Sequence, residues 1–250
     1  MAETKETGKA DLHVHTSYSD GMADARAVLE YVEAHTALEV LAITDHDDIR
    51  GALKAREIWA RGHYRFELVT GVELTTIEGH LLALFVEEPL PNLCHMEEAL
   101  EAIRKQGGLA VAPHPMNPFT RSLGERELRR AEGLHGIEAA SCSPGGAMRR
   151  GKALALNREL GLAEVGGSDA HFLDFIGGAY TTFQGSTAAE LKQAILSRDT
   201  SARNGRRPSL REIGVRRLTQ QTYRGIMTTP RRMGWGPTAG SFVRRIFGTR

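Results

Sequence analysis

Asp11-Leu12-His13-Val14-His15-Thr16-Ser17-Tyr18-Ser19-Asp20-Gly21 joins a short apolar segment to two histidines and a turn. In a β-strand, residues i and i+2 point to the same face, so the imidazoles of His13 and His15 leave one face together. Histidine is the commonest nitrogen ligand of divalent metals, and Asp20 adds a carboxylate close by. The stretch therefore predicts a metal site at a strand end. Short HxH strings also occur by chance, so the rest of the chain decides.

Five further apolar segments carry His, Asp or Glu at one end. They are residues 40–44 before Asp45-His46-Asp47, 66–72 before Glu73, 81–86 after His80, 109–113 before His114, and 163–168 before Asp169-Ala170-His171. In α/β sheets and barrels, active sites form at the carboxyl ends of the strands. Six of the ten histidines fall in these runs, and His35, His63, His95 and His135 do not. This clustering favours one shared site over scattered structural histidines.

Apolar strand patterns alternate with helical patterns along most of the chain. Strands are predicted at 10–15, 40–44, 66–72, 81–86, 109–112, 136–140, 163–166 and 179–183. Helices are predicted at 23–35, 48–61, 97–106, 125–131, 147–160 and 188–196. Continuous apolar strands between helices indicate an α/β fold with a mainly parallel, covered sheet. The pattern does not distinguish an open sheet from a barrel.

Composition sets broad limits. The chain has 250 residues, of which 41% are hydrophobic and 25% are charged, as in a globular protein with a large core. Its two cysteines form no disulfide framework or thiolate metal motif, which favours a reducing cytoplasm. Residues 1–9 lack the apolar core of a signal peptide, and no segment reaches the roughly 20 apolar residues of a membrane span.

The ordered motifs resemble one superfamily. They are HxHTxxSDG at 13–21, TDHD at 44–47, GVE at 71–73, GHLLAL at 79–84, PHP at 113–115 and GSDAH at 167–171. Together they are similar to the polymerase and histidinol phosphatase (PHP) superfamily over about residues 10–205. The resemblance implies a distorted (β/α)7 barrel. We expect a PHP domain at 1–202, and the change of charge described below predicts an arginine-rich tail at 203–250.

The resemblance also implies nine ligands for two or three divalent ions: His13, His15, Asp20, His46, Glu73, His80, His114, Asp169 and His171. One ion would be held by His13, His15, Glu73 and Asp169. A second would be held by Glu73, His80 and His114, and a third by Asp20, His46 and His171. Such nitrogen and oxygen ligands suit Zn, Mn or Fe.

The implied chemistry is hydrolysis of a phosphate ester by a metal-bound hydroxide. We assign Glu73, His114, Asp169 and Arg121 to catalysis, with Arg121 as the cation for phosphate. An ordinary solvated loop arginine is the alternative for Arg121. Asp45 is expected to orient a ligand, and Asp47 or Asp48 to cap the helix that follows. The stretch at 143–146 is expected to be a plain turn, with phosphate binding as the alternative.

The last 48 residues differ in charge. Residues 203–250 contain twelve arginines and one acid, 12 − 1 = +11, whereas the whole chain is +1. Helices are predicted at 210–227 and 241–247, the second resembling an interfacial helix. Three interpretations stay open: docking on an anionic membrane surface or on the acidic body of its own or another chain, nucleic-acid binding, or a tail without specific role.

The substrate is expected to be a nucleotide, a short oligonucleotide or a small phosphorylated metabolite. Asp20 and the GHLLAL motif resemble the nucleotide-phosphatase and exonuclease branch more than histidinol phosphatases, which are the alternative. A second alternative is a non-catalytic accessory module that acts through the basic tail. The predicted location is the cytoplasm, with a peripheral membrane position as an option. No feature predicts an oligomeric state.

Overall fold

The computed structural model describes residues 7–143, 145–146 and 148–233. The chain divides into two compact units, Met1–Arg207 and Pro208–Arg250. The division into 1–202 and 203–250 stays a prediction. A strand that the sequence analysis did not predict, Thr200–Asn204, spans that boundary.

The first unit is built on one sheet. In the described part of the chain the strands are β1 (Thr7–Asp11), β2 (Val40–Ile43), β3 (Glu67–Thr75), β4 (His80–Leu84), β5 (Leu109–Ala112), β6 (Gly136–Ser141), β7 (Ala163–Gly167), β8 (Ala179–Gln184) and β9 (Thr200–Asn204). Their order is β7-β6-β5-β4-β3-β2-β1-β8-β9. Strands β1 to β3 are mutually parallel, as are β5 to β7, and β4 runs antiparallel between them. Strands β8 and β9 extend the other edge of β1 in antiparallel pairing.

The sheet curls until its two halves meet. A parallel bridge joins Val14, beyond β1, to Ala170, beyond β7. The Thr181 hydroxyl of β8 accepts from the Gly166 amide of β7 at 2.8 Å and lies 3.0 Å from its carbonyl oxygen. Strands β1 to β7 thus form a nearly closed barrel, which confirms the predicted distorted β/α barrel.

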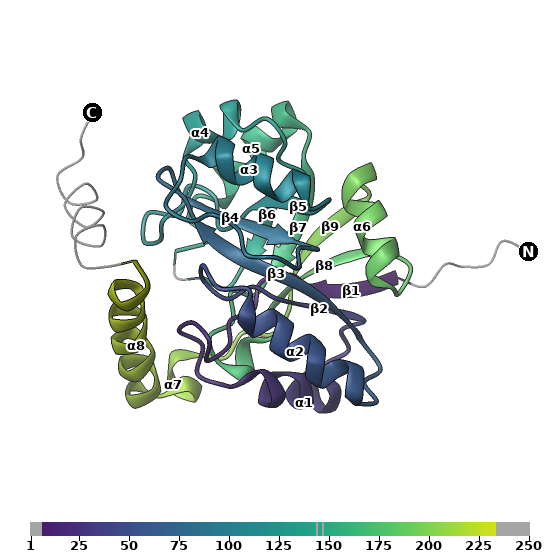
Figure 1. The fold of residues 1–250 in the computed structure, drawn as a ribbon, viewed down its shortest axis with the longest axis vertical. Coiled ribbons are helices and arrows are strands. Elements are labelled where there is room, and N and C mark those ends of the chain that lie inside the picture. Colours follow the sequence, from purple (N-terminus) through teal and green to yellow (C-terminus); the bar gives the residue numbers. More distant parts are fainter. Residues whose placement is uncertain (1–6, 144, 147, 234–250) are drawn as a thin grey trace, which may run out of the picture. The chain divides into compact units, whose positions relative to one another are not determined.

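Helices cover the outside of the barrel. They are α1 (Ala25–His35), α2 (Arg50–Arg61), α3 (Met96–Lys105), α4 (Glu125–Arg130), α5 (Arg150–Leu160) and α6 (Ala188–Ser197). Figure 1 shows α1 and α2 at one side of the barrel and α3, α4 and α5 at the opposite side. Local sequence sets their ends: the Asp24 side chain accepts from the Ala27 amide at the start of α1, and Thr187 with Glu190 forms a capping box on α6.

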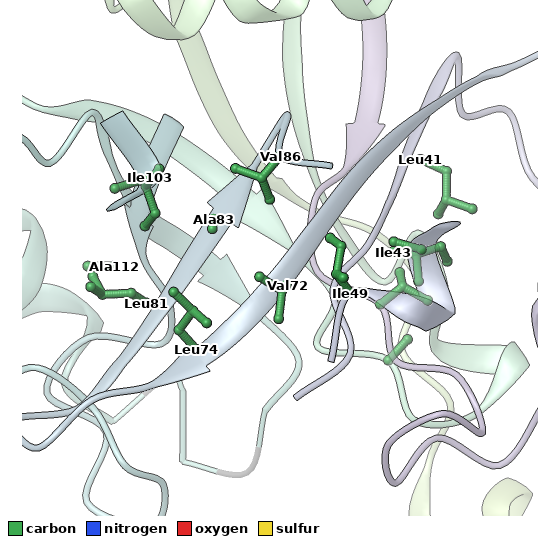
Figure 2. Packing of buried hydrophobic residues seen from close by; sticks show 14 of the residues in the cluster. Leu41, Ile43, Ile49, Val72, Leu74, Leu81, Ala83, Val86, Ile103 and Ala112 are labelled. Carbon is green, nitrogen blue, oxygen red and sulfur yellow. The ribbon is translucent and has the colours of Figure 1, made fainter. Parts of the chain in front are cut away.

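Alternate residues of the strands supply two separate cores. In β2, Leu41 and Ile43 belong to the core under the helices, whereas Val40 and Ala42 face the barrel interior. The same alternation holds in β4 and β5, because side chains along a strand alternate between its faces. Figure 2 shows part of the core under the helices, with Leu41, Ile43 and Ile49 near β2 and other members around β3 and β4.

The barrel interior is apolar at one end and polar at the other. Leu191, Ala194 and Ile195 of α6 join the interior core, and the Ala188 amide donates to the carboxylate of Glu67, the first residue of β3. Helix α6 therefore closes the end of the barrel where the parallel strands begin. The opposite end carries the polar side chains described below.

The second unit is helical where the structure describes it, with α7 (Leu210–Ile213) and α8 (Val215–Met233). The single helix predicted at 210–227 is wrong at its start, because Gly214 takes φ +77° and ends α7. The helix predicted at 241–247 lies outside the described residues. Among the described helices, none is long and apolar enough to cross a membrane.

Candidate metal centre

The nine predicted ligands meet at the carboxyl end of the parallel strands. His13, His15 and Asp20 follow β1, His46 follows β2, Glu73 lies in β3, His80 begins β4, His114 follows β5, and Asp169 and His171 follow β7. His80 precedes its strand because β4 runs antiparallel, so its first residue reaches the same barrel end. The predicted strand at 10–15 is too long: β1 ends at Asp11, and the HxH segment continues beyond it.

Strand alternation aims several of these side chains inward. In β4, His80 shares a face with Leu82 and Leu84, which line the barrel interior. In β3, Glu73 shares a face with Val69. Glu73 is fully buried and His80 is 8% exposed, so the apolar interior ends in a polar cluster.

The first group surrounds the two histidines of the HxH motif. The Nε2 atoms of His13 and His15 lie 3.0 Å apart. They lie 3.1 Å and 3.3 Å, respectively, from Oε2 of Glu73. They also lie 3.5 Å and 3.2 Å, respectively, from Oδ1 of Asp169. Four ligand-type atoms thus converge within 4.8 Å of one another.

Glu73 links this group to a second one. Its Oε1 lies 2.8 Å from His80 Nδ1 and 3.0 Å from His114 Nε2. Its Oε2 also lies 3.1 Å from His46 Nδ1. The two oxygens of one carboxylate therefore face five imidazoles, which is the geometry that a bridging ligand requires.

A third group forms on the far side of His15. His15, Asp20, His46 and His171 bring one ligand-type atom each to within 4.8 Å of the others. Oδ1 of Asp20 lies 3.1 Å from His171 Nε2. It is buried and forms no well-aligned hydrogen bond among the described residues. A buried carboxylate oxygen without an aligned donor, facing several imidazoles, fits a cation.

The electrostatics of the cluster also fit cations. Burial opposes the charged form of Glu73, but attraction from His46, His80 and His13 outweighs it and lowers the pKa well below its usual range. Burial likewise opposes protonation of His15, but hydrogen bonds to Asp169 and Glu73 raise its pKa to about 10. His46 shows the opposite outcome, because burial lowers its pKa to about 4. Nearby positive charge stabilises the buried carboxylates. The imidazoles lie too close to one another for all of them to be protonated, so they cannot provide all of that charge.

Two of the grouped residues have left-handed backbones. His114 has φ 30° and Asp169 has φ 54°, values that side chains with a Cβ adopt at a cost. Each lies two residues beyond the end of its strand, where the chain turns into a loop. Strain of this kind is concentrated at functional sites.

Glu138 of β6 supports the cluster and is absent from the sequence prediction. Its Oε1 lies 3.1 Å from His13 Nδ1, and its Oε2 accepts from the His114 amide at 2.7 Å. Gly167 makes room for it, because a Cβ there would lie 2.6 Å from Glu138 Oε1. The sequence signal was a single acid in the apolar run 136–140. Ile137 faces the helices, so Glu138, the next residue of the strand, faces the barrel interior.

The two aspartates beside His46 have different structural roles. Asp45 accepts from the amides of Thr16 and Ser19 at 2.8 Å and 3.1 Å, so it fixes the loop between His15 and Asp20. Asp47 is not the predicted helix cap. It has φ 52°, and its carboxylate accepts from the Thr75 amide at 2.6 Å and from the Thr75 hydroxyl at 2.7 Å.

Arg121 lies on the loop after β5. Its guanidinium donates to the Thr76 carbonyl at 2.9 Å, which ties this loop to the turn between β3 and β4. Burial lowers the pKa of His80, and the positive charge of Arg121 lowers it further. The residue is therefore near the cluster, and its binding of phosphate stays a prediction. In the predicted turn, Gly146 donates to the Ser143 carbonyl at 3.0 Å, while residue 144 lies outside the described residues.

Comparisons with known proteins agree with this architecture. Residues 148–200 match a family model described as PHP-associated. An uncharacterized protein of Methanocaldococcus jannaschii is 40% identical over 129 residues, which cover 47% of this chain and 74% of that protein. The 5'-3' exoribonuclease Rnm of Escherichia coli is 31% identical over 160 residues, 60% of this chain and 48% of Rnm.

A solved structure shows the same fold. It is a two-domain protein from Bacteroides vulgatus containing a predicted PHP-like metal-dependent phosphoesterase, with a TM-score of 0.65 and 22% identity over 88% of this chain and 70% of that one. Fold and side-chain cluster together define a β/α barrel with a centre of His, Asp and Glu at its carboxyl end. The chain belongs to the PHP superfamily.

Proposed function

We propose that this protein hydrolyses a phosphate ester of a nucleotide or short oligonucleotide with two or three divalent ions. The observation that carries the proposal is the position of Glu73, whose two carboxylate oxygens face five imidazoles within 3.3 Å. One ion cannot use so many ligands. A bridging carboxylate between adjacent ions is the arrangement expected for in-line displacement at phosphorus.

The nine clustered residues are assigned as the ligands, in the three groups described above. Divalent Zn, Mn or Fe held there would lower the pKa of a coordinated water and neutralise charge on the phosphate. Glu138 orients His13 through Nδ1, so that Nε2 points into the centre. The hydroxyls of Thr120 and Ser122, at 3.1 Å and 3.0 Å from His114 Nδ1, orient His114 in the same way.

Arg121 is assigned to the phosphate of the substrate. Its guanidinium is anchored on the β3–β4 turn and lies near His80, so it adds fixed positive charge beside the centre. A preorganised cation of this kind stabilises the negative charge that moves onto phosphate oxygens during displacement.

The nucleotide assignment rests on the similarity to the exoribonuclease Rnm. The chain spans about half the length of Rnm, so the similarity supports the class of bond cleaved and leaves the length of the substrate open. Mononucleotides and short oligonucleotides are therefore the substrates to test first.

The test is a panel of nitrophenyl phosphate monoesters and diesters and short RNA, assayed with added Mn or Zn and again after chelation. His114→Ala and Asp169→Asn should each lose several orders of magnitude in turnover. The matched control is His63→Ala, which removes an exposed histidine between α2 and β3. Wild-type turnover in either centre variant, or metal-independent hydrolysis, would contradict the proposal.

A further inference from the structure

Exposed apolar side chains gather on the loops around the centre. In the described part of the first unit, the large hydrophobic residues with the most exposure are Met148 at 66%, Phe119 at 55%, Leu196 at 45% and Ile77 at 43%. Ile77, Phe119 and Met148 lie on the connections that follow β3, β5 and β6, at the end of the barrel that carries the centre. Leu196 lies on α6, which closes the opposite end.

Phe119 is held next to a residue of the centre. The hydroxyl of Thr120, the next residue, lies 3.1 Å from His114 Nδ1. On its other side, the Phe119 amide donates to the Asn117 side chain at 3.0 Å, and the Asn117 amide donates to the His114 carbonyl at 3.2 Å. Hydrogen bonds on both sides of Phe119 therefore tie this part of the loop to His114.

The ring rests on a glycine. A Cβ at Gly145 would lie 2.4 Å from Cδ2 of Phe119, and Gly145 also has φ +77°. Both the space and the backbone conformation therefore require glycine at this position. The ring packs against the backbone of the β6–α5 loop and still remains 55% exposed, so its orientation is set before any ligand binds.

A cation stands two residues further along the same loop. The guanidinium of Arg121 donates to the Thr76 carbonyl, and the backbone carbonyl of Arg121 accepts from the His80 amide at 3.1 Å. The loop therefore offers an imidazole, a guanidinium and an exposed aromatic ring within eight residues. This combination matches a phosphate ester whose alcohol carries a planar ring.

We propose that Phe119 is a stacking platform for the nucleobase next to the phosphate that the centre holds. The proposal rests on the proposed function and deepens it by naming the residue that selects base-bearing substrates. Stacking of one base on an aromatic side chain changes affinity by roughly 5- to 150-fold. Phe119 would therefore contribute to binding and KM, while the cluster of imidazoles and carboxylates determines turnover.

The experiment compares the methylene phosphonate analogues of adenosine 5'-monophosphate and ribose 5-phosphate, which differ by the base and have no ester bond to hydrolyse, so the titration reports binding alone. Titration calorimetry is performed on the Mn-loaded full chain as wild type, Phe119→Ala, Phe119→Trp and Leu196→Ala. Wild type should bind the nucleotide analogue about 5- to 150-fold more tightly than the sugar analogue. Phe119→Ala should abolish that preference with unchanged affinity for the sugar analogue, whereas Phe119→Trp and Leu196→Ala should keep it.

Two results would overturn the platform: equal binding of both probes by wild type, or an unchanged preference in Phe119→Ala. Hydrolysis of the ester panel is measured on the same samples. A nucleotide preference that depends on Phe119 in a protein without metal-dependent hydrolysis would refute the proposed function and support the platform. Metal-dependent hydrolysis without a base preference would support the proposed function and refute the platform.

Discussion

Replacing Glu138 by glutamine tests how the centre is held in place. Both carboxylate oxygens of Glu138 accept hydrogen bonds, one from His13 Nδ1 at 3.1 Å and one from the His114 amide at 2.7 Å. Glutamine keeps one acceptor and turns the other into an NH2 group. One of the two contacts would then face a donor with a donor, in a site where Glu138 is 4% exposed.

The size of the effect follows from the bonds that are lost. A hydrogen bond to a charged group contributes about 1.5–3 kcal/mol. Loss of a group that orients a metal-binding histidine costs about 10- to 100-fold in metal affinity or activity, which is about 1.4–2.7 kcal/mol. The two ranges overlap, so Glu138→Gln is expected to weaken metal binding by about 10- to 100-fold.

The assay is competition for Zn or Mn against a fluorescent chelator. Glu164→Gln is the matched control, because Glu164 lies on the neighbouring strand β7 and is only partly buried. The melting temperature of the chelated protein, measured in parallel, separates a loss of metal affinity from a loss of fold. Metal affinity in Glu138→Gln equal to that of wild type would refute the reasoning.

Elemental analysis of protein never exposed to chelator should find two or three transition-metal ions per chain, and one ion or none would contradict the cluster. Glu73→Gln should lose more than one ion, because Glu73 faces two groups of ligands. Chelation should lower the melting temperature by about 5–10 °C, which corresponds to about 2.7 kcal/mol of ligand stabilisation in a domain of this size, and calorimetry with metal added back should restore it. Burial raises the pKa of the half-buried Cys142 thiol to about 12, so alkylation of native protein at pH 8, followed by mass spectrometry, should be slow at Cys142, and rapid labelling would contradict the raised pKa. Truncation after Arg207 removes a segment of charge 9 − 1 = +8. It should leave ester hydrolysis unchanged and weaken salt-sensitive binding to anionic vesicles or RNA. If the truncated protein unfolds, the second unit is instead part of the fold.

The candidate ligands were predictable from the sequence because strand ends converge. In parallel strands the carboxyl ends share one edge, so polar residues after separate apolar runs meet in space. His80 fitted this rule only after the structure showed β4 running antiparallel. Strand direction depends on partners distant in the sequence, which the local pattern does not encode.

Other features were not predicted because their sequence signals are weak or ambiguous. An aspartate before a helix predicts an N-cap, but Asp47 adopts φ 52° and its carboxylate accepts from the Thr75 hydroxyl instead. Strand β9 has no apolar alternation and its residues are partly exposed or exposed, since it lies at the sheet edge. Glu138 was not predicted because a single acid in an apolar run forms no motif. Side chains alternate along a strand, so a residue next to Ile137, which faces the helices, faces the barrel interior.

The barrel interior explains why this cluster can exist at all. Over most of its length the interior is filled by apolar side chains, and α6 closes one end with Leu191 and Ile195. That apolar body contributes stability without any metal, so the other end can concentrate charges that burial alone would penalise. The cost is reduced where each charge has a fixed partner, as Glu138 provides for His13, and a bound cation would reduce it further. On the loops beyond the cluster a large ring can stay exposed, and Phe119, which rests on Gly145, keeps half of its surface open for the substrate recognition that we propose.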